Sequence, residues 1–149
     1  MNTPCTCSTL RQLNRKVTNI YDHHLAVHEI RIGQFSLLAK IGRAGIVGFA
    51  PLAELMGMDR STLSRTLKPL IQSGWIETGD ESLDASCDKR SFTVRLTKNG
   101  KQKYTQSRPE WLKAQRHIDA LLGKQQHQLL VQVLEQANNH LESEGTAHE

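Results

Sequence analysis

Five polar side chains within eight positions carry groups that suit the reading of duplex DNA. Hydroxyl groups reach bases or phosphates, an arginine can pair with a guanine edge through two hydrogen bonds, and a lysine is a natural phosphate contact. The pattern therefore favours a DNA-binding face, whereas the same charges on an isolated amphipathic helix would more often mark an ordinary solvated surface. The five residues are Ser61, Thr62, Ser64, Arg65 and Lys68.

These side chains need a helix to present them, and the sequence predicts one over residues 60–73. Asp59 is the expected N-cap, since its carboxylate can accept from the N–H groups of Ser61 or Thr62. Pro69 is expected to bend the helix rather than end it, because the apolar spacing continues beyond it. The apolar stripe expected behind the polar face consists of Leu63, Leu67, Leu70 and Ile71.

A second short helix is predicted just ahead of the first. Pro51 suits the first position of a helix, and Gly57 tolerates the left-handed geometry that follows a helix end. Leu52, Leu55 and Met56 are expected to share one apolar face. Two helices joined by a tight turn are typical of a helix-turn-helix, whose second helix enters a groove of DNA.

Two strand-like runs then predict a β-hairpin, or wing. Residues 75–78 and 92–96 are rich in β-branched and aromatic residues, and the stretch between them is polar. Lys89 and Arg90 near its tip suit the narrow minor groove, where negative potential is concentrated. Asp88 is expected to pair with Arg90 and fix the direction of that side chain; a flexible, solvated loop is the alternative.

The distribution of charge agrees with this placement. Residues 60–108 contain 10 Lys and Arg against 5 Asp and Glu, a net charge of +5, while the rest of the chain has 9 against 10, a net of −1. A local excess of positive charge drives the release of counterions from the phosphate backbone, which supplies affinity without choosing a sequence.

Apolar residues at helical spacing continue on both sides of this region. On the N-terminal side, helices are predicted from Ser8 and over residues 34–41. On the C-terminal side, Thr97 is the expected cap of a long helical pattern of apolar residues, which breaks at Gly123 and then resumes as far as Leu141. Because one small DNA-binding region cannot cover so much apolar surface, burial against a second copy in a homodimer is the simplest solution. We expect supporting and dimerisation helices over residues 1–45, the DNA-binding region over 46–100 and further dimerisation helices over 101–149.

Length and composition set the outer limits. A chain of 149 residues with 38% hydrophobic residues is one domain, or one domain with appended helices. No run approaches the ~18–20 apolar residues that cross a bilayer, and the first ten residues lack a secretion signal, so we expect a cytoplasmic protein without membrane partners. The sequence has no phosphate-cradling glycine loop, nucleophile elbow or suitably spaced carboxylate pair, which predicts that it is not an enzyme and has no cofactor.

Four runs of residues together resemble the MarR family of bacterial transcription regulators, and the likeness extends over nearly the whole chain. The resemblance implies a mainly α fold with a small β-hairpin wing, a homodimer whose first and last helices interlock, and repression of genes near a pseudo-palindromic operator. It implies base reading by the 61–68 face and minor-groove contact by Arg90. The four runs are Leu52 to Arg65, Gly74-Trp75-Ile76, Asp88-Lys89-Arg90 and Val94 to Gly100.

The resemblance also implies a small effector, commonly an aromatic acid or phenolic compound, that wedges between the dimer helices and the DNA-binding region and releases the DNA. Tyr21, His24 and Arg43 are the candidates for lining such a cleft. A tyrosine at helical spacing is more often part of a core, and an arginine near a helix end is more often solvated. His24, Val27 and His28 stand where the family's pattern is more apolar. The sequence therefore does not fix which residues line the pocket.

The cysteines offer a competing input. Cys5 and Cys7 lie two positions apart ahead of the first predicted helix, and Cys87 lies in the wing. Such thiols are open to oxidation or can bind a soft metal ion, and a thiol in the wing would link this chemistry to DNA contact. Incidental free thiols are the alternative, because no further ligands stand at zinc spacing and no metal is assigned. From another class of function, the same surface charges would suit a winged-helix module that binds proteins.

Overall fold

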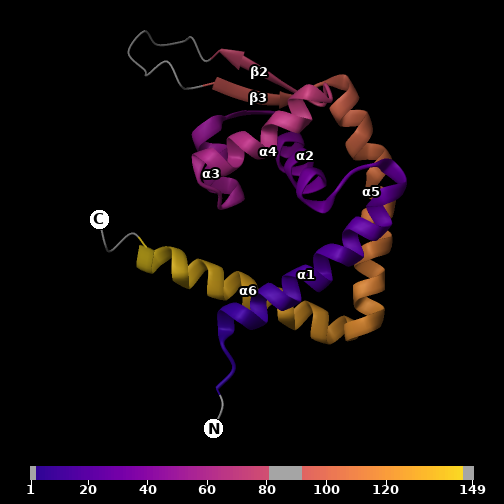
Figure 1. Ribbon diagram of the computed structural model, residues 1–149, viewed down its shortest axis with the longest axis vertical. Helices are drawn as coiled ribbons and strands as arrows, with labels where there is room; N and C mark the ends of the chain where they lie inside the picture. Colours follow the sequence, from indigo (N-terminus) through magenta and orange to yellow (C-terminus); the bar gives the residue numbers. More distant parts are fainter. Residues whose placement is uncertain (1–2, 81–91, 146–149) are drawn as a thin grey trace. The chain divides into compact units, whose positions relative to one another are not determined.

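The computed structural model describes residues 3–80 and 92–145 and is mainly helical (Figure 1). Its elements separate into two compact units, Tyr21–Trp111 and a terminal-helix unit made of Met1–Ile20 with Leu112–Glu149. In chain order the elements are α1 (Thr6–Leu25), a 3-10 turn (Ala26–His28), α2 (Ile32–Ala44), β1 (Ile46–Gly48), α3 (Phe49–Met56), α4 (Arg60–Gln72), β2 (Ile76–Asp80), β3 (Phe92–Leu96), α5 (Lys98–Leu122) and α6 (Lys124–Gly145).

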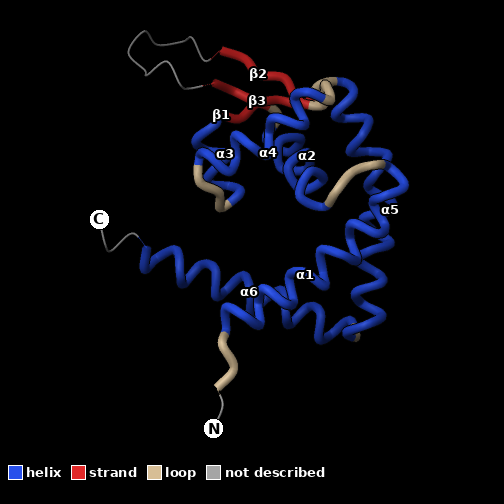
Figure 2. Tube along the Cα trace, viewed as in Figure 1, coloured by secondary structure: helices blue, strands red, loops and turns tan. Residues whose placement is uncertain are grey.

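The Tyr21–Trp111 unit contains a three-stranded antiparallel sheet in the order β1-β3-β2. The predicted hairpin is confirmed, with Ile76 opposite Leu96 and Asp80 opposite Phe92. The third strand, β1, was not predicted, because only its pairing with β3, Val47 opposite Val94, makes so short a run a strand. The strands lie together along one edge of this unit, with α2, α3 and α4 beside them (Figure 2).

One apolar core joins the elements of the Tyr21–Trp111 unit. Three aromatic rings extend it along α2 and α5, since Phe35 stacks on Tyr104 at 5.2 Å and on Trp111 at 5.8 Å between ring centroids. Burial of this apolar surface is the main force that holds the unit together. Its buried members are Leu25, Ile30, Phe35, Leu37, Leu38, Ile41, Phe49, Leu52, Ala53, Leu63, Leu67, Leu70, Ile76, Val94 and Leu96.

Three details of the predicted helices were wrong. Helix α3 begins at Phe49, so Pro51 is its third residue, still within the first turn, where backbone N–H groups have no partner inside the helix. Leu55 is 49% exposed, because the buried arc of this short helix is centred on Leu52 and Ala53. Ile71 is 38% exposed, because it lies at the edge of the buried arc of α4.

The terminal-helix unit buries few apolar side chains. Ala114 and Ile118 are its buried apolar residues among those the structure describes. Gly123, at φ +83°, ends α5 as predicted, and across the turn the Nδ1 atom of His127 lies 2.7 Å from Oδ1 of Asp119. Large apolar side chains remain exposed along the rest of α5 and α6, namely Leu121, Leu122, Leu129, Val131, Val133, Leu134 and Leu141. None of the helices described has the length and apolar character required to cross a membrane.

Candidate nucleic-acid interface

The start of α4 is fixed by the side chain of Asp59. Its Oδ1 accepts hydrogen bonds from the backbone N–H of Thr62 and from Oγ of Ser61, both at 2.7 Å, and its Oδ2 accepts from Oγ1 of Thr62 at 2.8 Å. These bonds, that of Ser61 first, hold the pKa of Asp59 well below its usual range. Gly57 adopts left-handed geometry at φ +60° just ahead of it. The predicted cap and turn are both confirmed.

Helix α4 separates an apolar face from a polar one, as the sequence predicts. Leu63, Leu67 and Leu70 are at most 1% exposed and anchor the helix in the core. Thr62 is half-buried, and its Oγ1 lies 3.5 Å from Nη2 of Arg65. The helix continues through Pro69 to Gln72 rather than stopping. The exposed members of the polar face are Ser61, Ser64, Arg65 and Lys68.

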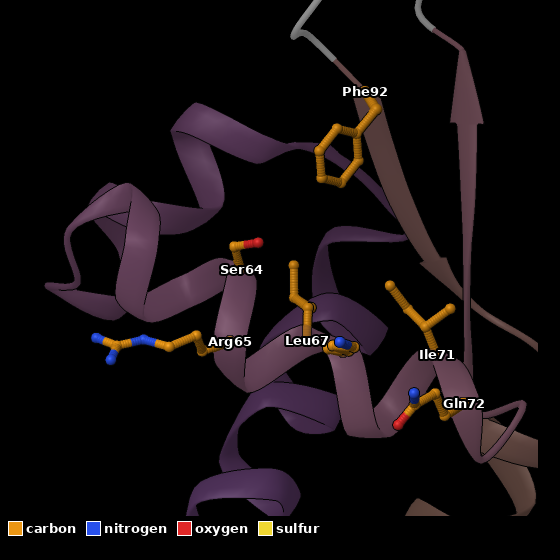
Figure 3. Close-up of a pocket in the computed structure, with 7 residues that line it drawn as sticks. Ser64, Arg65, Leu67, Ile71, Gln72 and Phe92 are labelled. Atoms are coloured by element: carbon orange, nitrogen blue, oxygen red, sulfur yellow. The ribbon is translucent and has the colours of Figure 1, made fainter.

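A hollow of about 570 Å³, the α4–β3 hollow, opens beside this face. In Figure 3 the side chains of Ser64, Leu67 and Ile71 rise from α4 toward the strand that carries Phe92, while that of Arg65 extends away from them. The hollow thus combines cationic and polar groups with an apolar floor. Its lining residues are Ser64, Arg65, Leu67, Lys68, Ile71, Gln72 and Phe92.

The strand side of the hollow is held in place by contacts at the base of the wing. The ring of Phe92 packs on that of Phe49, with 4.8 Å between centroids, and the guanidinium of Arg60 lies 5.6 Å above the Phe49 ring. Across the hairpin, Nε of Arg95 lies 2.8 Å from Oε1 of Glu77. Because Arg95 is paired within the sheet, it is less available than Arg65 to a bound anion.

Comparison with known proteins shows what this region is similar to. The model of the MarR family matches residues 30–79, which span α2, the helix-turn-helix and most of β2. Over these residues the chain is similar to the MarR family. It is 32% identical over 88 residues to the multiple antibiotic resistance protein MarR of Salmonella typhimurium, a match that covers 59% of this chain and 58% of that relative. The chain therefore spans a little more than half the length of this relative.

Solved structures of MarR-type proteins share the fold over most of the chain. A mutant MarR from E. coli complexed with operator DNA has a TM-score of 0.74 and 23% identity, covering 87% of this chain and 91% of that one. The M. tuberculosis transcriptional regulator MOSR, in complex with DNA, has a TM-score of 0.73 and 25% identity, covering 91% and 98%. The predicted resemblance and the winged helix-turn-helix fold are thus confirmed.

The predicted wing residues of this chain lie outside the described residues. Lys89 and Arg90, their expected support Asp88, and Cys87 all fall within 81–91. Their roles stay predictions from the sequence.

The cavity that Arg43 lines includes neither Tyr21 nor His24, the other two predicted effector residues. Tyr21 is half-buried and packs against the core, in line with the alternative considered for it, and the ring of His24 lies edge-on to that of His23. Arg43 is exposed and lines a separate cavity of about 350 Å³ between α2, β3 and α5. The other residues of that lining are Ala39, Gly42, Leu96, Lys101, Tyr104 and Thr105.

The sequence analysis did not identify Lys101 and Tyr104 as candidate effector-binding residues. The available signal was their spacing of three in a helix that follows the cap at Thr97, where Oγ1 accepts from the N–H of Gly100 at 3.0 Å. That spacing places both on one side of α5, but nothing in the sequence shows that Arg43 lies opposite.

The two described cysteines are both exposed free thiols. Cys5 precedes α1, and Cys7 lies in its first turn. Among residues 3–80 and 92–145, no three His, Cys, Asp or Glu side chains gather in a way that would hold a metal ion. A metal-responsive role for these thiols therefore gains no support, whereas their exposure leaves oxidation chemically accessible.

Proposed function

We propose that this protein is a sequence-specific DNA-binding transcription regulator. The observation that carries the proposal is the polar face of α4, which is exposed to solvent while Leu63, Leu67 and Leu70 hold the helix from behind. Two structures similar in fold, a mutant MarR from E. coli and MOSR from M. tuberculosis, are DNA complexes. A helix with this arrangement suits the major groove of DNA.

Different side chains of α4 would make different kinds of contact with DNA. Arg65 would pair with a guanine edge and supply sequence choice, while Lys68 would neutralise a phosphate. The hydroxyl groups of Ser61, Thr62 and Ser64 would add contacts to bases or backbone. From the wing, Lys89 and Arg90 would reach the minor groove with Asp88 directing Arg90, an assignment that rests on the sequence alone.

A homodimer would complete the DNA-binding molecule. The terminal-helix unit leaves Leu129, Val133 and Leu141 more than half exposed, which is costly for a helix in water and favours burial against a second copy. Dimerisation through residues 1–45 and 101–149 would set two copies of the 46–100 region about one DNA turn, ~34–36 Å, apart. Such a dimer fits a pseudo-palindromic operator.

Regulation would come from a small effector that releases the operator, so that the protein acts as a repressor. The cavity beside Arg43 offers two cations, Arg43 and Lys101, a phenol at Tyr104 and an apolar wall at Leu96. These groups suit the carboxylate and ring of an aromatic acid or phenolic compound.

Thiol oxidation is the second candidate for the trigger. The exposure of Cys5 and Cys7 favours it, and Cys87 in the wing would add a direct link to DNA contact. Peroxide titration of operator binding in the wild type and a Cys5→Ser/Cys7→Ser double mutant separates the two triggers. If peroxide changes operator binding equally in the two proteins, the thiols are not the trigger. If the double mutant no longer responds to peroxide, thiol oxidation is favoured over the effector as the main trigger.

Selection of bound duplexes from a random pool tests the proposed function itself. We expect one pseudo-palindromic sequence to be enriched, with an affinity that falls steeply as salt rises. A module that binds proteins through the same surface would enrich no sequence and show no such dependence on salt.

A further inference from the structure

We infer that the α4–β3 hollow receives the deoxyribose-phosphate backbone of one DNA strand, with Ile71 and Phe92 as an apolar floor beneath the sugars. This inference rests on the proposed function and adds to it a contact that is independent of base sequence. It assigns a role to Ile71 and Phe92, which belong neither to the cap nor to the polar face of α4.

The position of the hollow follows from the helical repeat of α4. Ser64, Lys68 and Ile71 are spaced by four and three residues and so share the side of the helix that faces β3, whereas Arg65 extends in another direction (Figure 3). A base pair that meets Arg65 in the major groove therefore brings its flanking backbone beside the hollow. The strand that separates this groove from the minor groove must pass between α4 and the hairpin of β2 and β3.

The chemistry of the lining matches that of the backbone. Two cations, Arg65 and Lys68, stand with a hydroxyl and an amide, and among the residues that the structure describes no carboxylate belongs to the lining. The other lining residues, Leu67, Ile71 and Phe92, are apolar, and Phe92 faces α4 from the strand side (Figure 3). A DNA strand alternates anionic phosphates with largely apolar deoxyriboses, so the same surface can pair Lys68 with a phosphate while Ile71 packs on the adjacent sugar.

The exposure of Ile71 supports this assignment. The residue is 38% exposed although its neighbours Leu67 and Leu70 are at most 1% exposed. Phe92 is half-buried, and its contact with Phe49 holds the ring at the edge of the hollow. Both side chains thus offer apolar surface at a fixed position next to the cations, and contact with DNA would remove that surface from water.

The test compares Ile71→Ala with Leu55→Ala in the full-length protein. Leu55 is 49% exposed on α3 and does not line the hollow, so it is a matched control for loss of exposed apolar surface. Binding is measured on the selected operator and on a scrambled duplex over a range of salt concentrations. We expect Ile71→Ala to weaken both duplexes by about three- to tenfold with an unchanged salt slope, and Leu55→Ala to change neither by more than about twofold.

Other substitutions and a footprint make the result specific. Lys68→Ala should weaken both duplexes and reduce the salt slope by about 1, because it removes an ionic contact. Phe92→Leu keeps an apolar side chain at the strand edge and should behave like a mild form of Ile71→Ala. Hydroxyl-radical footprinting should show that Ile71→Ala loses protection of the deoxyriboses that flank the base contacted by Arg65.

Three outcomes would overturn the inference. They are loss of affinity for the operator alone, a changed salt slope in Ile71→Ala, and equal behaviour of Ile71→Ala and Leu55→Ala. If a small aromatic anion occupies the hollow instead, Ile71→Ala will alter release by that compound and leave DNA affinity unchanged, which also contradicts it. Failure of the proposed function is distinguishable, because the wild type itself would then show no salt-dependent binding to DNA.

Discussion

The two units of this protein differ in how far their apolar side chains are buried. In the Tyr21–Trp111 unit Leu63, Leu67 and Leu70 are buried within one chain. In the terminal-helix unit Leu129 and Val133 are more than half exposed along α6. The first unit therefore closes its own core and can present a rigid polar face, while the second leaves apolar surface in contact with water, as the proposed homodimer requires.

The same substitution in the two units should have different consequences. Leu67→Ala removes a fully buried side chain and should lower the free energy of unfolding by about 2–5 kcal/mol. Leu129→Ala removes a side chain that is 58% exposed, so its cost should fall on dimer formation instead. Denaturant titration at several protein concentrations measures both, and a loss for Leu129→Ala that does not depend on concentration would remove the distinction.

A charge on α6 should prevent formation of the proposed dimer and leave the Tyr21–Trp111 unit folded. Val133→Asp places a carboxylate on a face proposed to be buried between copies, and the protein should sediment as a monomer. Its affinity for the full operator should fall by about 100-fold, since each monomer binds one half-site, while its circular dichroism stays close to that of the wild type. A Val133→Asp protein that still sediments as a dimer would contradict this use of α6.

Two glycines make a sharper test of packing inside the Tyr21–Trp111 unit. A Cβ at Gly100 would collide with the backbone carbonyl of Trp75, where α5 begins against the base of β2, whereas a Cβ at Gly33 on α2 would meet nothing within 4 Å. Gly100→Ala should therefore lower the free energy of unfolding by about 1–3 kcal/mol. Gly33→Ala should leave it unchanged or raise it slightly. Equal melting temperatures for the two variants would show that α5 starts elsewhere.

The smallest expected effect is the pH dependence contributed by Asp59. Its pKa in the folded protein lies below the ordinary value of 3.8, so the cap stabilises α4 fully above that value and loses its effect as pH falls further. Asp59→Asn keeps a capping oxygen without a titrating group. Its thermal stability should therefore fall less steeply than that of the wild type between about pH 4 and pH 2. Parallel profiles would show that the carboxylate is not held by Ser61 and Thr62.

The sequence was sufficient where the structure depends on neighbours along the chain. The cap at Asp59, the ends at Gly57 and Gly123, and the leucine stripe of α4 follow from local hydrogen bonding and from the helical repeat. Strand β1 could not be predicted, because three residues become a strand only through partners almost fifty positions later.

The rest of the site depends on contacts between distant parts of the chain. The exposure of Leu55 and Ile71 follows from where the core lies around each helix, which periodicity alone does not fix to within one residue. The Arg43 cavity joins α2 to β3 and α5, so its members Lys101 and Tyr104 could not be grouped with Arg43 from spacing.

The claim that α4 reads DNA is tested most directly by the sequence discrimination of Arg65→Ala. Affinities of wild type and variant are measured at one salt concentration for the selected operator and for a set of duplexes, each with one base pair changed. The account predicts that Arg65→Ala weakens operator binding by about 1–3 kcal/mol and no longer discriminates at one position of each half-site. Unchanged discrimination at every position would contradict it.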